Sequence, residues 1–66
     1  MQDPDYSAAW KGLGQSLTQL DRPKDAIGAF EAGIAAANRK GDAQAGREME
    51  VFLKRLRKRL DSDSPR

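Results

Sequence analysis

Two stripes of apolar residues at helical spacing, separated by a proline turn, constrain this chain more than any other feature. The first stripe consists of Trp10, Leu13, Leu17 and Leu20. The second consists of Ala26, Ile27, Phe30, Ile34 and Ala37. Steps of three and four residues place side chains on one face of an α-helix. The turn contains Pro23, which suits a first helical position because the missing N–H would be unpaired there. The pattern predicts helices over residues 7–20 and 23–38.

A third helix is predicted over residues 43–60. Gly41 suits a left-handed cap at the end of the preceding helix, and Asp42 suits the N-cap of the next. At about 100° per residue, six apolar side chains fall within one arc of the third helix. These residues are Ala45, Met49, Phe52, Leu53, Leu56 and Leu60. We expect this apolar side to pack on the first two helices, which gives an all-α fold.

The spacing of the first two helices is more specific than amphipathic patterning alone. The specific residues are Trp10, Leu13, Gly14, Ala26 and Phe30. Over residues 4–38, this pattern resembles a tetratricopeptide repeat, a helix–turn–helix unit of about 34 residues. The chain departs from that pattern at Leu17, where an aromatic residue is usual, at Gly33, where alanine is usual, and at Asn38, where proline is usual. Gly14 is expected to allow close approach of the second helix.

The resemblance implies an antiparallel helical hairpin over residues 7–38, followed by a C-terminal amphipathic capping helix over residues 42–60. Residues 1–6 would form a turn at a repeat boundary, and residues 61–66 a frayed tail. The core is expected to contain Trp10, Leu13, Leu17, Phe30, Phe52 and Leu56. A capping helix is expected because a terminal repeat must present a polar outer face.

The resemblance also implies a binding surface, since first helices in this family line a groove that holds a peptide or a partner helix. The residues expected to contact a partner are Ala8, Lys11, Gln15, Thr18 and Gln19. Some members clamp a terminal carboxylate with lysine and asparagine; Lys11 matches that lysine, whereas Gln15 replaces the asparagine. The alternative interpretation is that these are exposed polar residues without a partner.

The basic character of the chain lies in its last third. Nine of the twelve Lys and Arg residues follow residue 37, against five acidic residues there. A candidate electrostatic patch consists of Lys54, Arg55, Lys58 and Arg59. It could meet nucleic-acid phosphates or an acidic partner. Alternatively, these charges solvate a helix whose C-terminus favours cations. Nucleic acid is disfavoured because no aromatic residue lies among the charges to stack on bases.

The composition argues against several classes of protein. The chain has no cysteine and no histidine, so thiolate and imidazole metal sites are excluded, and we expect no catalytic site, metal or cofactor. No apolar run approaches the roughly 20 residues of a membrane span, and no signal peptide is recognisable. A cytoplasmic location without membrane association is the expectation.

These observations predict a non-catalytic protein–protein interaction module, either an adaptor or the terminal fragment of a longer repeat array. One edge of the first helix, formed by Tyr6, Ala9, Leu13 and Leu17, would lack the cover of a preceding repeat. A homodimer through that edge is one closure, and a monomer with a tolerated open edge is the other. Two alternative functions remain: a basic nucleic-acid-associated module, and a purely structural or designed minimal repeat.

Overall fold

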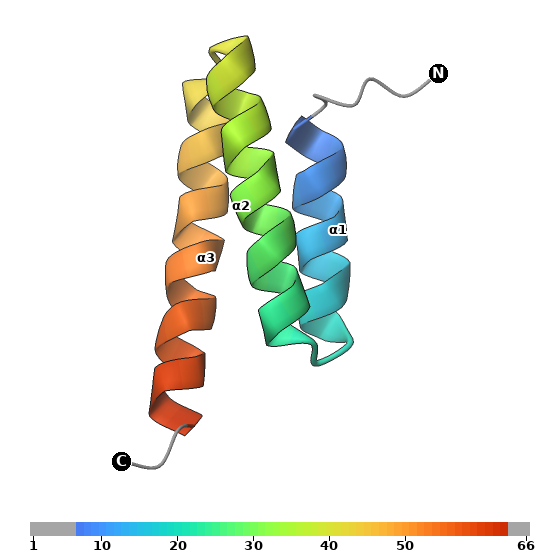
Figure 1. Ribbon diagram of the computed structural model, residues 1–66, viewed down its shortest axis with the longest axis vertical. Helices are drawn as coiled ribbons and strands as arrows, with labels where there is room; N and C mark the ends of the chain where they lie inside the picture. Colours follow the sequence, from blue (N-terminus) through green and yellow to red (C-terminus); the bar gives the residue numbers. More distant parts are fainter. Residues whose placement is uncertain (1–6, 64–66) are drawn as a thin grey trace.

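The computed structural model describes residues 7–63, which form three helices in a row (Figure 1). The helices are α1 (Ser7–Gln19), α2 (Pro23–Lys40) and α3 (Ala43–Asp63). Consecutive helices are antiparallel, and α2 lies between the other two (Figure 1). It packs on both, whereas α1 and α3 touch only a little. The expected all-α hairpin with a third helix is confirmed, while the repeat boundary expected in residues 1–6 lies outside the described residues.

The helix α1 ends one residue earlier than predicted, at Gln19, and the turn to α2 follows directly. Asp21 adopts a left-handed conformation with φ of 60°. The Asp21 N–H donates to the carbonyl of Thr18 at 3.1 Å, and the Arg22 N–H donates to the carbonyl of Leu17 at 2.9 Å. This pair of bonds satisfies carbonyls that a helix end leaves free. Leu20, which was expected to be the last residue of the helix, therefore lies in the turn.

The other helix ends also differ from the predicted boundaries. Gly41 takes the expected left-handed conformation with φ of 72°, and the Asp42 N–H donates to the carbonyl of Ala37 at 2.8 Å. Because Asn38 retains the N–H that a proline would lack, α2 continues to Lys40. α3 runs to Asp63, three residues beyond the expected end, since no glycine or proline follows Leu60 within the helix. The first half of the expected tail, residues 61–63, is thus helical.

The core lies where α2 faces its two neighbours. Its buried cluster consists of Ala26, Phe30, Ala37, Met49, Leu53 and Leu56. Partly buried side chains packed against it are Trp10, Leu17, Ile27, Ile34, Ala45 and Phe52. The expectation for Leu13 is wrong, because this side chain is 45% exposed. The helix α1 packs through Trp10, Gly14 and Leu17, which leaves Leu13 on its outer side.

Two buried glycines set how closely the helices approach. A Cβ at Gly14 would lie 2.6 Å from two ring atoms of Phe30, so the expected close approach of α2 is confirmed. A Cβ at Gly33 would lie 2.7 Å from the Cβ of Trp10 and would also overlap the sulfur of Met49. The usual alanine therefore does not fit at position 33, because α1 and α3 both come close to α2 there.

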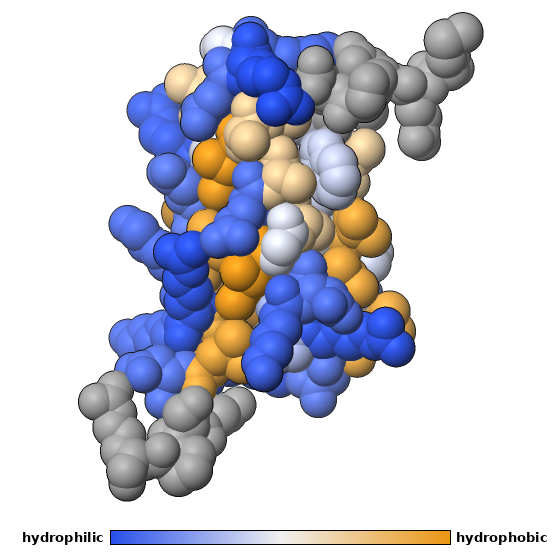
Figure 2. Space-filling model, in the orientation of Figure 1, coloured by the Kyte–Doolittle hydropathy of each residue, from blue (hydrophilic) through white to orange (hydrophobic). Residues whose placement is uncertain are grey.

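Polar and apolar side chains are distributed unevenly over the surface of the three helices. Hydrophilic side chains cover much of α3 in Figure 2, whereas apolar side chains gather along the free edge of α1. Leu13 of α1 and Leu20 of the following turn are 45% and 68% exposed. No helix within residues 7–63 is long and apolar enough to cross a membrane.

Candidate interaction site

Two adjoining hollows lie between α1 and α3, and we refer to them together as the α1–α3 groove. The first has a volume of about 370 Å³ and is lined by Gln15, Thr18, Gln19 and Phe52. The second has a volume of about 330 Å³ and is lined by Thr18, Phe52, Arg55, Leu56 and Arg59. Because the hollows share Thr18 and Phe52, they form one continuous surface. Each volume is within the roughly 300–1,000 Å³ of ordinary ligand pockets.

Three of the five residues expected to contact a partner line this groove. Gln15, Thr18 and Gln19 form its α1 wall, since residues three and four apart share one helix face. The Thr18 hydroxyl donates to the carbonyl of Gly14 at 2.8 Å, which fixes the side chain against its own helix. Gln15 and Gln19 are exposed and present amides that can both donate and accept hydrogen bonds.

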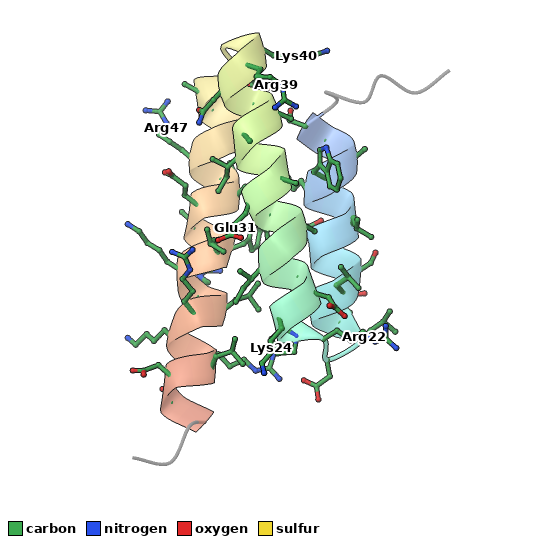
Figure 3. All side chains as sticks on the ribbon, in the orientation of Figure 1. Arg22, Lys24, Glu31, Arg39, Lys40 and Arg47 are labelled. Carbon is green, nitrogen blue, oxygen red and sulfur yellow. The ribbon has the colours of Figure 1, made fainter. Side chains whose placement is uncertain are left out.

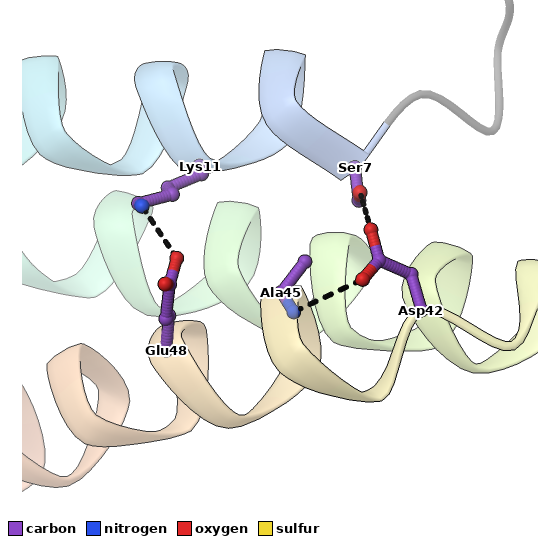
Figure 4. Close-up of polar contacts among 5 residues, drawn as sticks. All are labelled: Ser7, Lys11, Asp42, Ala45 and Glu48. Atoms are coloured by element: carbon purple, nitrogen blue, oxygen red, sulfur yellow. Dashed lines mark hydrogen bonds and ion pairs between the residues drawn. The ribbon is translucent and has the colours of Figure 1, made fainter.

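The other two residues lie on α1 but do not line the groove. Ala8 is exposed near the start of the helix. Lys11 places its ammonium nitrogen 2.7 Å from Glu48 Oε1 on α3 (Figure 4). This ion pair engages the ammonium group that a carboxylate clamp would require, so an incoming carboxylate would have to compete with Glu48.

Polar contacts join α1 to α3 at the end of the molecule where both helices begin. Beside the Lys11–Glu48 pair, the Ser7 hydroxyl donates to Asp42 Oδ2 at 3.5 Å (Figure 4). The other carboxylate oxygen of Asp42 accepts the backbone N–H of Ala45 at 3.2 Å, which confirms the expected N-cap of α3. These contacts lie at the opposite end of α1 from the groove.

Two of the four residues of the candidate basic patch line the groove. Arg55 and Arg59 line the groove, whereas Lys54 and Lys58 are exposed outside its lining. Arg59 Nη2 lies 2.7 Å from Asp21 Oδ1 at the α1–α2 turn. Arg55 and Arg59 therefore line the same groove as Gln15, Thr18 and Gln19 of α1.

A fifth cation of α3 turns toward the opposite side of the helix. Glu31 lies on the side of α2 that faces α3 (Figure 3). Arg57 Nη2 lies 2.8 Å from Oε2 of Glu31. Arg57 does not line the groove. Of the last three arginines of α3, Arg57 thus contacts α2, whereas Arg55 and Arg59 line the groove.

The floor of the groove was not predicted as part of a site. Phe52 was assigned to the core, and one face of its ring does stack on Phe30, with centroids 5.4 Å apart and planes 9° from parallel. It is nevertheless only half-buried and borders both hollows. Its position at the edge of the apolar arc, beside Arg55 and Arg59 on the helical wheel, is the sequence signal for this double role.

The composition of the groove suits recognition of another chain. The floor of Phe52 and Leu56 can bury an apolar side chain, the glutamines can bond a peptide backbone, and the arginines can pair with carboxylates. Within residues 7–63, no three carboxylates gather in a group that could hold a metal ion.

Comparison with known proteins gives one informative relative. Over 55 residues, the chain is 47% identical to a TPR repeat-containing protein of Pseudomonas aeruginosa. The match covers 83% of this chain and 52% of that protein, so the chain spans about half the length of the relative. No family model and no solved structure matches the chain. The residue pattern, the packed helical hairpin and this relative agree that the chain contains a repeat of the tetratricopeptide type.

Proposed function

We propose that this chain is a non-catalytic protein–protein interaction module that binds an extended peptide or a helix of a partner in the α1–α3 groove. The observation that carries the proposal is the continuity of the two hollows across Thr18 and Phe52. A tetratricopeptide-type repeat supports an interaction role in general, and the groove supplies a surface for it.

The direction of the two walls favours a linear partner. Since α1 and α3 are each antiparallel to α2, they run in the same direction (Figure 1). Residues of both helices line the groove. An extended segment lying along it would meet the amides of α1 on one side and the guanidinium groups of α3 on the other. Because one repeat offers a short groove, we expect modest affinity from this chain alone and higher affinity within a longer array.

The proposal is tested by selecting binders from a random peptide library with the whole chain and then blocking the groove. Gln15→Trp fills the first hollow from an exposed position, whereas Ala35→Trp adds the same bulk to an exposed position of α2 outside the groove. We expect selected peptides to lose binding to Gln15→Trp and to keep it with Ala35→Trp. Equal binding to both variants would contradict the proposal.

Self-association through the free edge of α1 is a second candidate function. It is favoured by the exposure of Leu13 and Leu20 along this edge. Exposed apolar patches of a few hundred Å² mark interfaces in many proteins, and a two-fold dimer is the simplest closed arrangement.

Sedimentation equilibrium of the whole chain tests self-association. A dimer at high concentration is expected to become monomeric in the Leu13→Gln/Leu20→Gln variant, while Lys24→Gln at an exposed position of α2 serves as the control. A chain that remains monomeric at millimolar concentration would remove this candidate.

A further inference from the structure

We infer that the α1–α3 groove takes an acidic segment of a partner protein, with an apolar side chain on Phe52, and that Asp21 competes with that segment for Arg59. The inference rests on the proposed function of the groove. Beyond that function, the inference specifies the kind of segment that binds and identifies a residue of the chain that competes with the segment for Arg59.

The charge of the groove lining favours an acidic occupant. Among the described residues, the lining contains Arg55 and Arg59 and no carboxylate. Within residues 7–63, Arg55 has no acidic partner, so its guanidinium is available to a ligand. Arginine can bind a carboxylate through two parallel N–H groups, which gives direction as well as charge attraction.

The floor of the groove favours an apolar side chain beside that acid. One face of the Phe52 ring is covered by Phe30, yet the residue remains partly exposed where the two hollows meet. Leu56 extends the apolar surface toward Arg55 and Arg59. A leucine-sized side chain seated there would bring flanking carboxylates toward the arginines and its backbone toward Gln15 and Gln19.

Asp21 already places one carboxylate beside Arg59, although Asp21 does not itself line the groove. Its Oδ1 atom lies 2.7 Å from Arg59 Nη2, and the left-handed turn with φ of 60° fixes its backbone at the end of α1. The side chains of Asp21 and Arg59 are 77% and 47% exposed, and ion pairs so open to water contribute little to stability. An incoming carboxylate can therefore replace Asp21 at low cost.

A peptide fits these contacts better than a nucleic acid does. Nucleic-acid binding draws its affinity from a row of cations that follows successive phosphates. Here Lys54 and Lys58 lie outside the groove lining, and Arg57 is paired with Glu31 of α2. The groove thus offers two guanidinium groups over an apolar floor, which suits a short acidic and apolar motif.

The test compares two short synthetic peptides, both capped at their termini so that only side chains carry charge. One has a central leucine flanked by glutamates, and the other has the same leucine flanked by glutamines. Titration of the isotope-labelled chain, followed by amide chemical shifts, reports the affinity and the location together. We expect the glutamate peptide to bind about tenfold tighter, with shifts at the groove, because two charge-assisted contacts are added.

Two pairs of variants separate the groove contacts from overall charge. Asp21→Asn keeps a residue type that tolerates the left-handed turn and frees Arg59, while Glu31→Gln changes net charge equally and frees Arg57 outside the groove. We expect Asp21→Asn alone to tighten the glutamate peptide, by about two- to fivefold. Arg55→Gln should weaken it, whereas Lys54→Gln, outside the lining, should have little effect.

The outcomes distinguish this inference from the proposed function. If both peptides bind equally and Gln15→Trp blocks both, the groove binds peptides but the acidic preference is wrong. If Gln15→Trp blocks neither, the proposed function itself is wrong. Equal effects of Asp21→Asn and Glu31→Gln would overturn the role of Asp21. A short single-stranded RNA that displaces the glutamate peptide and binds more tightly would replace the peptide by a nucleic acid.

Discussion

Gly33 is a residue of α2 that both α1 and α3 approach closely. The space above its Cα is filled by the Trp10 Cβ of α1 and the Met49 side chain of α3. A helix-interior glycine costs about 1 kcal/mol relative to alanine in propensity. At this position the loss is offset by packing, since a side chain would separate α2 from both neighbours. A Cβ at Gly28, in the same helix, would meet no heavy atom within 4 Å, so the glycine there serves no such purpose.

We expect Gly33→Ala to destabilise the chain by about 1–2 kcal/mol. Overpacking costs about 1–3 kcal/mol, and the gain in helix propensity offsets part of that cost. The matched control Gly28→Ala should instead stabilise it by about 0.5–1 kcal/mol, because only the propensity term acts there. Urea unfolding followed by circular dichroism measures both changes. A stabilising Gly33→Ala would show that Met49 and Trp10 move aside without penalty.

The two ends of α2 are built differently. Its C-terminus has Gly41 in the left-handed cap and Arg39 and Lys40 in the last turn, where cations complement the helix dipole. Its N-terminus has Pro23 and a first-turn acid, Asp25, but the cap residue Arg22 makes no side-chain hydrogen bond to the helix. The first turn of α2 therefore has backbone N–H groups without a side-chain acceptor at the cap.

Arg22→Ser is expected to stabilise the chain by about 0.5–1 kcal/mol, because a serine hydroxyl at the N-cap can accept one of these N–H groups. Lys24→Ser, two residues later and also exposed, removes the same charge without creating a cap and should bring no gain. Thermal unfolding of the two variants side by side makes the comparison. If Lys24→Ser stabilises as much as Arg22→Ser, the effect comes from charge and not from capping.

The stability of the whole molecule depends on one small hydrophobic core. Phe30 and Met49 are the largest fully buried side chains, and both lie in the single cluster where α2 meets α3. The connections between α1 and α3 include the exposed Lys11–Glu48 ion pair, and a pair of this kind contributes at most about 1 kcal/mol. A domain of this size rarely has more than about 3–5 kcal/mol of folding free energy. Loss of one core side chain can therefore remove most of it.

Met49→Ala is expected to leave the chain largely unfolded at room temperature. Truncating a buried methionine costs about 2–5 kcal/mol, which is comparable to the whole stability of the domain. Val51→Ala, on the same helix but 49% exposed, should retain the fold. Far-ultraviolet circular dichroism distinguishes the two. A Met49→Ala chain that keeps its helices and unfolds cooperatively would show that stability is spread beyond this core.

The sequence by itself determined the three helices and most of their packing faces. Apolar spacing, Pro23, Gly41 and Asp42 act over a few residues, so their effects could be predicted without knowing the rest of the molecule. The C-terminal ends predicted for the three helices from this local information differ from those in the structure by one to three residues. The geometry of each turn and cap decides where the helical hydrogen bonds stop.

The tertiary structure decided which faces meet, and with them the groove. The sequence suggested Gln15, Thr18 and Gln19 as one surface and Arg55 and Arg59 as another, while Phe52 was assigned to the core. Their convergence depends on how α1 and α3 both pack on α2, at the spacing that Gly14 and Gly33 allow. It also leaves Leu13 outside, although its helical period matches that of Leu17. The residues that line the groove from α1 and from α3 are more than thirty positions apart, and a local pattern cannot bring them together.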